Sequence, residues 1–177
     1  MEALPMNSEH GLGTMGCKMK TVFFLGSIVA VTVYLIVAAV EDYKTCQVTR
    51  WKHFISLIPA FLWFVINIRQ LLIVDFAIIL AFLLAFIGIG YAGIYGLADG
   101  LVFANLSLLF GGTGGAAGIG MVILIMLVAG FSFFICHVWS RFIKKESIFK
   151  NAAGPLIPHI TVGYIITMLG LLCRTAI

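Results

Sequence analysis

The sequence predicts an all-α integral membrane protein with six transmembrane helices and short loops. Of its 177 residues, 62% are hydrophobic and only 10% are charged, and the mean hydropathy is +1.15. Such a chain cannot present an ordinary water-facing surface. A helix needs about 20 apolar residues to cross a bilayer, and irregular backbone cannot face lipid. We therefore expect a polar, mobile tail over residues 1–20, followed by a single membrane domain over residues 21–177.

The six predicted spans follow one another along the chain. The first, 21–40, is the clearest because it carries no charge. Its apolar run is longer than the core of a signal peptide and further membrane segments follow, so we interpret it as a span. The other five are expected at 54–68, 76–90, 99–110, 118–138 and 159–172. The glycine-rich segment 111–120 is predicted to form the turn between the fourth and fifth spans.

Lysine and arginine residues in alternate loops indicate the orientation. One side of the membrane holds Lys44, Arg50, Lys52, Arg141, Lys144, Lys145 and Lys150, and the other holds Lys18, Lys20, Arg69 and Arg174. The larger set is expected in the cytoplasm, with both ends of the chain outside. These basic residues are spread over loops without an aromatic-interleaved stripe, so anionic lipid headgroups are the expected partners and nucleic acid is not.

Two acidic residues, Asp42 and Asp99, are expected at the same membrane face. Asp42 ends the first span, two spans then cross and return, and Asp99 opens the fourth. Two neighbouring carboxylates cannot both ionise cheaply, so one would hold a proton while the other activates water. Asp99 is at a helix N-terminus and Asp42 near a C-terminus, which favours Asp42 as the proton holder. The alternative is two boundary acids that only cap helices or reach the headgroups.

Three stretches resemble one known family. They are "GLADG" at 96–100, "VEDYKTCQVTRWKHF" at 40–54 and "PLIPHITVGYIITML" at 155–169. The first resembles the G-x-G-D motif of the type IV prepilin peptidases and preflagellin peptidases, a family of membrane aspartyl proteases. The second is similar to the family's other aspartate motif and the third to its last helix. The resemblance covers most of residues 21–172.

This resemblance implies a catalytic pair formed by Asp42 and Asp99. It implies hydrolysis of one peptide bond in a prepilin at the cytoplasmic face of the cell membrane. The bond follows a short basic leader, typically after a glycine, and precedes a hydrophobic helix. No metal or other cofactor is required. Nothing in the chain matches the N-terminal domain linked to methyl transfer, so we expect a short form that processes Flp-like pilins or preflagellins.

Residues around the acids are expected to shape the site. Ala98 stands where the family has its second glycine, and the added methyl group restricts φ beside Asp99. Gly96 and Gly100 suit either a close approach of substrate backbone or close helix packing. Glu41 is an extra acid that either raises the pKa of the pair, attracts the lysines of the leader or faces the headgroups.

The remaining polar residues favour structural roles. Asp75 is interpreted as the N-cap of the third span, and Asn105 and Ser107 as residues that bond between helices. The histidines His53, His137 and His159 show no ligand spacing, and the scattered cysteines form no C-x-x-C pair, so no metal site is predicted. Two alternatives to a protease remain: an inactive family member that assists pilus assembly, and a small ion-coupled transporter.

Overall fold

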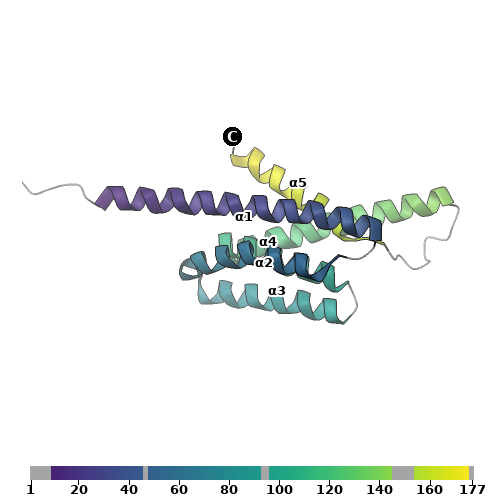
Figure 1. Cartoon of the computed structure of the whole chain (residues 1–177), viewed down its shortest axis with the longest axis horizontal. Helices are drawn as coiled ribbons and strands as arrows, with labels where there is room; N and C mark the ends of the chain where they lie inside the picture. The colour runs from purple at the N-terminus through teal and green to yellow at the C-terminus, as the bar shows by residue number, and fades with distance from the viewer. Residues whose placement is uncertain (1–8, 46–47, 93–95, 145–153, 176–177) are drawn as a thin grey trace, which may run out of the picture.

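The computed structural model describes residues 9–45, 48–92, 96–144 and 154–175, with side chains for 19–45, 48–49, 51–92, 96–144 and 154–171. Within these ranges the chain consists of helices joined by short connections and has no strand (Figure 1). Its elements are α1 (Glu9–Thr45), α2 (Arg50–Asn67), the 3₁₀ helix η1 (Ile68–Gln70), α3 (Ile73–Tyr91), α4 (Leu97–Lys144) and α5 (Ile157–Thr175). Residues 1–8 of the predicted tail, and Lys145 and Lys150, lie outside the described residues.

Helix α1 is longer than the sequence pattern predicts. It begins at Glu9, so much of the segment expected as a tail is helical. Its buried stripe is formed by Val31, Leu35, Ala38 and Asp42, at spacings of three and four residues that fall on one helix face. α1 packs against α5 and α2. The stripe therefore carries Asp42 into the helix bundle.

Helix α4 consists of two helical segments. Gly114 and Gly115 have non-helical backbone angles, with φ of +57° at Gly115, a value that glycine adopts at little cost. Gly118 lies so close to the Phe110 carbonyl oxygen that a side chain would overlap it. In a straight helix these residues would be about 12 Å apart. The second segment therefore folds back on the first, and the break lies inside the predicted turn at 111–120.

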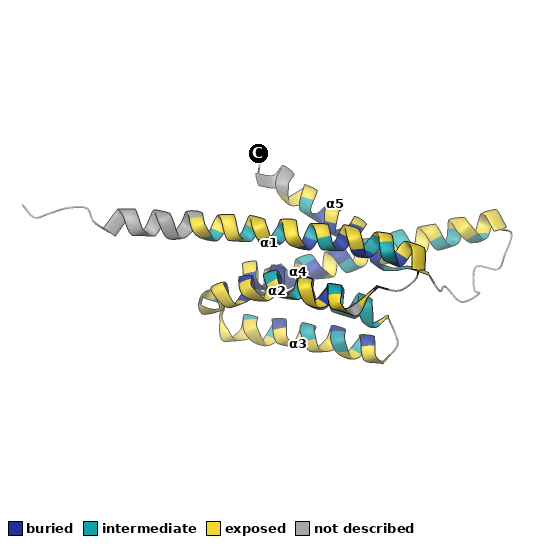
Figure 2. Ribbon diagram, viewed as in Figure 1, coloured by how far each residue is buried: buried dark blue, intermediate teal, exposed yellow. Residues whose placement is uncertain are grey.

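The first segment of α4 is the centre of the molecule. Nearly every residue from Gly100 to Gly112 is buried (Figure 2). α3, α2 and α5 all pack against α4, so a helix that is apolar all round is covered on all sides. Asp99 is in the first turn of this central helix.

Asp75 connects α3 to the break in α4. Its carboxylate accepts hydrogen bonds from the backbone N–H of Ala116 at 2.9 Å and of Leu72 at 3.4 Å. Asp75 is the third residue of α3, not its N-cap as the sequence suggested, since Leu72 occupies that position. The contact with Ala116 was not expected. One carboxylate thus satisfies orphan N–H groups of two helix starts.

The helices fit a membrane. α1, α2 with η1, α3 and α4 are each long and apolar enough to cross one, and α5 is a shorter apolar helix. A straight helix of 48 residues would measure about 72 Å, more than twice the thickness of the hydrocarbon layer. Large apolar side chains such as Val29, Val33 and Ile58 are exposed on the outer faces. The molecule is an all-helical protein of the multi-pass membrane type.

Candidate active site

Asp42 is held in the bundle by α5. Its side chain is only 7% exposed, and its Oδ2 accepts a hydrogen bond of 3.1 Å from the backbone N–H of Ile157. Ile157 is the first residue of α5, after a leading proline in the sequence. The N-terminus of a helix has unsatisfied N–H groups and a partial positive charge that favour an anion. The start of α5 therefore supplies the buried Asp42 carboxyl group with a hydrogen-bond donor.

Asp99 is held by the start of its own helix. Its Oδ2 accepts a hydrogen bond of 3.2 Å from the Gly96 N–H. A Cβ atom at position 96 would lie 3.0 Å from the same oxygen, tighter than most real contacts. Asp99 is half-buried, in the first turn of α4. Gly96 thus leaves room for the carboxylate to fold over the end of α4.

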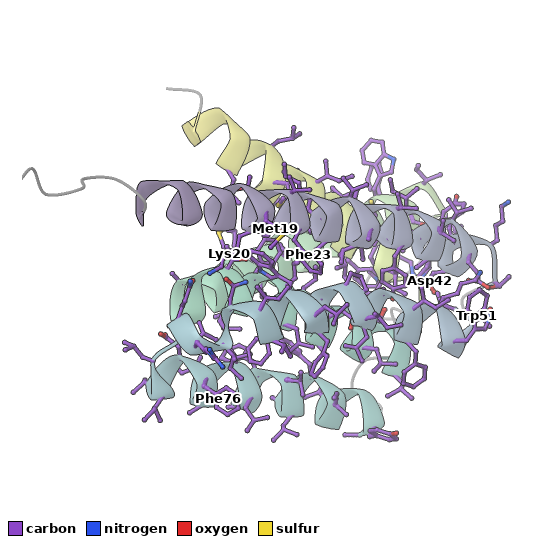
Figure 3. The ribbon with its side chains drawn as sticks, turned by 60° about the vertical axis from the view of Figure 1, so that its left-hand side comes forward. Met19, Lys20, Phe23, Asp42, Trp51 and Phe76 are labelled. Atoms are coloured by element: carbon purple, nitrogen blue, oxygen red, sulfur yellow. The ribbon has the colours of Figure 1, made fainter. Side chains whose placement is uncertain are left out.

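The two acids lie at the same end of the molecule. Asp42 is near the last turn of α1 and Asp99 in the first turn of α4. They are close enough for the charge of Asp42 to act on the Asp99 carboxyl group. In Figure 3, Asp42 and Trp51 are at one end and Met19, Lys20 and Phe76 at the other. We call the end with Asp42 and Asp99 the acid end.

The contact with α5 removes the argument for Asp42 as the proton holder. The sequence placed Asp42 near a helix C-terminus, and Asp42 does lie near the C-terminus of α1. In the structure Asp42 also faces the N-terminus of α5, whose N–H it binds. Both carboxylates therefore face a helix N-terminus, and the helix dipoles do not distinguish them. Asp42 and Asp99 differ instead in exposure, since Asp42 is buried and Asp99 is partly exposed.

Glu41 is paired with residues at the start of α2. Its carboxylate makes an ion pair with the Lys52 Nζ at 2.7 Å and accepts a hydrogen bond from the Thr49 hydroxyl, also at 2.7 Å. Glu41 thus connects the end of α1 to the start of α2, and the roles expected for it from the sequence stay predictions.

The residues flanking Asp99 serve packing. A Cβ at Gly100 would lie 2.6 Å from the Phe86 carbonyl oxygen, so this glycine allows α3 and α4 to approach closely. Ala98 is part of helix α4 and its methyl group packs against the hydrophobic core. Alanine is the best helix former. The missing second glycine of the motif therefore causes no backbone strain here.

A buried polar cluster lies beside the acids, and the sequence did not reveal it. The Tyr34 hydroxyl is hydrogen-bonded to His53 Nδ1 and to Ser56. Ser56 donates to the His53 carbonyl oxygen at 2.8 Å and accepts from the Asn105 amide at 2.6 Å. The charge of Asp99 acts on the Tyr34 hydroxyl. The cluster joins α1, α2 and α4 next to the candidate site.

One atom of this cluster has no partner among the described residues. It is the Nε2 of His53, a residue that is 2% exposed. The bond from Asn105 to Ser56 confirms the prediction that Asn105 bonds between helices. The same prediction is wrong for Ser107, whose hydroxyl donates to Phe103 in its own helix. Polar residues inside apolar spans are the signal that could have indicated the cluster.

The other histidines are separate from this cluster. His159 Nδ1 lies 2.9 Å from the Ser132 hydroxyl, and the Phe133 ring contacts both His159 and His137. Within the part of the chain that the structure describes, no three metal-ligating side chains gather. What the acid end offers chemically is a pair of carboxylates.

No family model, curated protein or solved structure matches this chain.

Proposed function

We propose that this protein is a membrane aspartyl endopeptidase that removes the short leader of a type IV prepilin or preflagellin. One observation carries the proposal: Asp42 and Asp99, far apart in sequence, lie at the same end of an all-helical bundle. The resemblance of their surroundings to the two aspartate motifs of the prepilin peptidases supports the substrate class. So does the absence of strain at Ala98, where the motif differs.

The proposed topology has six spans. α1, α2, α3, the two segments of α4 and α5 each cross the bilayer once, since the fold-back after Gly114 divides α4 into two crossings. This parity brings the end of α1 and the start of α4 to one face. The excess of lysine and arginine in the loops of that face makes it cytoplasmic. The acid end then meets cytoplasmic water at the membrane boundary.

The proposed reaction is hydrolysis with one proton shared by the two carboxyl groups. The ionised carboxylate takes a proton from water as the oxygen attacks the scissile carbonyl carbon, and the protonated carboxyl donates its proton to the carbonyl oxygen. The tetrahedral intermediate then collapses, the C–N bond breaks, and a proton passes to the leaving amine. The helix N-terminus of α5 fixes Asp42, and Gly96 fixes Asp99. The products are the basic leader and the shortened pilin.

Co-expression with a prepilin tests the proposal. Asp42→Asn and Asp99→Asn should each lower the cleavage rate by about 100-fold or more, since general acid–base groups contribute about 10²–10⁴. Glu41→Gln is the matched control, because its neighbouring carboxylate is paired with Lys52. It should keep most of the activity. All variants are compared at equal protein level in the membrane by immunoblot.

The same experiment separates the alternatives. Cleavage that survives both aspartate changes would overturn the protease proposal. No cleavage of any tested prepilin by the unchanged protein, together with loss of filament assembly on its deletion, would favour an inactive family member. Proton- or ion-dependent uptake by reconstituted protein would favour a transporter.

A further inference from the structure

The two helices that carry the acids do not pack closely against each other. Within the described residues, α1 packs against α2 and α5, and α4 packs against α2, α3 and α5, whereas α1 and α4 make at most slight contact. Asp42 and Asp99 are therefore brought together by helices that lie between their own. The rotations of α1 and α4 about their axes, which decide where each carboxylate lies, depend on those connecting helices.

Helix α2 is hydrogen-bonded to the segment of α4 that carries Asp99. Near the acids, the Asn105 amide donates to the Ser56 hydroxyl oxygen at 2.6 Å. Near the opposite end of the bundle, the Trp63 indole N–H donates to the Thr113 hydroxyl oxygen at 3.1 Å. Each end of the bundle thus has one polar connection between these two helices.

The connection near the acids also includes α1. The Tyr34 hydroxyl of α1 is hydrogen-bonded to His53 Nδ1, and the Asn105 amide of α4 lies 3.4 Å from the His53 carbonyl oxygen as well as bonding Ser56. His53, Ser56 and Asn105 are each 2% exposed. His53 is the fourth residue of α2, and Asp42 is the fourth residue from the end of α1. The polar cluster therefore joins α1, α2 and α4 at the acid end.

Hydrogen bonds can fix the rotation of helices that apolar contacts leave poorly defined. Nearly every face of these helices is apolar, so apolar packing alone distinguishes poorly between neighbouring rotations. Hydrogen bonds have a narrow geometry, and one buried polar residue can set the register of an apolar helix interface. A helix with its side chains has a radius of about 5–6 Å, so a rotation of about 20° would move a carboxylate by about 2 Å.

We infer that His53 and Ser56 are positioning residues that, through the polar cluster, hold α1 and α4 at the rotations that bring the two acids together. They act through the helices and not on the reacting atoms. The inference deepens the proposed function and rests on it for the effect on cleavage. A displacement of about 1 Å caused by a change far from the chemistry can lower a rate about 100-fold. Loss of the cluster therefore lowers the cleavage rate although both acids remain.

Titration of the two acids tests their placement without any cleavage. The side-chain carboxyl ¹³C signals are followed against pH in the full-length protein in lipid nanodiscs. Asp42→Asn should shift the midpoint of Asp99 by an amount that depends on the distance between the two groups. We expect Ser56→Ala to reduce this shift by about a third or more, because Coulomb energy falls with distance. Ser107→Ala is the matched control and should keep the full shift, since this serine is also buried but bonds within its own helix.

Kinetics provide a second test. Ser56→Ala and Tyr34→Phe should each lower kcat for prepilin about tenfold or more with KM little changed, because the acids are displaced and substrate binding is not. The double variant should lose no more than either single one, since both changes break the same connection. Thr113→Val breaks the bond between α2 and α4 at the opposite end and should keep kcat within about twofold. Melting temperatures establish that equal amounts of folded protein are compared.

Two results would overturn the inference. One is an unchanged Asp99 shift in Ser56→Ala, and the other is an equal loss of kcat in Ser56→Ala and Thr113→Val. If the unchanged protein cleaves prepilin in either case, the proposed function still stands. If the unchanged protein cleaves no prepilin, the proposed function fails, and the titration alone decides whether the cluster positions the acids.

Discussion

At the acid end, Asp42 and Asp99 each accept a hydrogen bond from a backbone N–H at a helix start, and at the opposite end Asp75 does the same for Ala116. We call this opposite end, where α3 begins and α4 breaks, the turn end. Asp75 binds N–H groups of two helices. At the acid end two acids lie together, one from α1 and one from α4, and the charge of Asp42 acts on the Asp99 carboxyl group.

The comparison shows when a carboxylate at a helix start indicates more than folding. A single acid at such a place is explained by the orphan N–H groups that it satisfies. A second acid brought alongside it costs stability, because like charges resist ionising together. Asp75 at the turn end is therefore explained by its structural role. The two acids at the acid end add an electrostatic cost to stability that the structural role of a single acid does not require.

The pH dependence of cleavage should show the largest effect. Cleavage needs one protonated and one ionised carboxyl group, so the rate should be bell-shaped and fall about tenfold per pH unit on each side. The low-pH fall arises when the second carboxylate gains a proton, and the high-pH fall when the pair loses its shared proton. A pH–rate profile that stays bell-shaped in the Asp42→Asn variant would contradict the proposal that Asp42 and Asp99 act as a pair. Asp75→Asn should leave the profile unchanged.

Gly118→Ala should strongly destabilise the turn end. The added methyl group would overlap the Phe110 carbonyl oxygen, and backbone has little freedom to shift. We expect a loss of about 3 kcal/mol or more of unfolding free energy, seen as a lower melting temperature in detergent. Gly120→Ala is the control, since its Cβ would meet nothing within 4 Å. Equal melting temperatures for the two variants would contradict the fold-back of α4.

Asp75→Asn should have a smaller effect on stability. The amide keeps the shape, but its single oxygen can accept only one of the two hydrogen bonds from Ala116 and Leu72. The bond that remains is weaker, because charge-assisted hydrogen bonds are stronger than neutral ones. We expect a loss of about 1–2 kcal/mol, as for other helix-start residues. Cleavage per folded molecule should persist. A loss of cleavage without a fall in melting temperature would give the turn end a part in the reaction.

Lys52→Met should have the smallest effect. It removes the ion pair with Glu41, and exposed ion pairs contribute little to stability. We expect a melting temperature close to that of the unchanged protein, and a prepilin cleavage rate within about twofold. A large loss of cleavage at equal stability would show that Glu41 and Lys52 take part in the active site.

The sequence predicted the parts of this molecule that depend on local pattern. Apolar runs indicated the helices, and the glycines at 111–120 indicated where α4 reverses. Counting the helices between Asp42 and Asp99 predicted that both acids lie at the same end, and they do. The start of α1 at Glu9 was missed, because the residues before Thr21 are polar and glycine-containing yet continue the helix.

Contacts between distant helices were beyond the reach of the sequence. Asp42 binds Ile157, and Asp75 binds Ala116, through backbone groups that carry no residue-type signal. The cluster around Tyr34 and His53 depends on how α1, α2 and α4 are rotated about their axes. The spacing of hydrophobic residues does not identify which face of such a helix is buried, because nearly every face is apolar.

The bond between Asp42 and Ile157 has a consequence for biogenesis. The carboxylate is made early in synthesis, but the N–H that anchors it belongs to α5 and emerges more than a hundred residues later. A nascent chain that has inserted only its first helices therefore holds an unanchored acid. Under the proposed function, cleavage would begin only after α5 has docked, and a partly synthesised chain would be inactive.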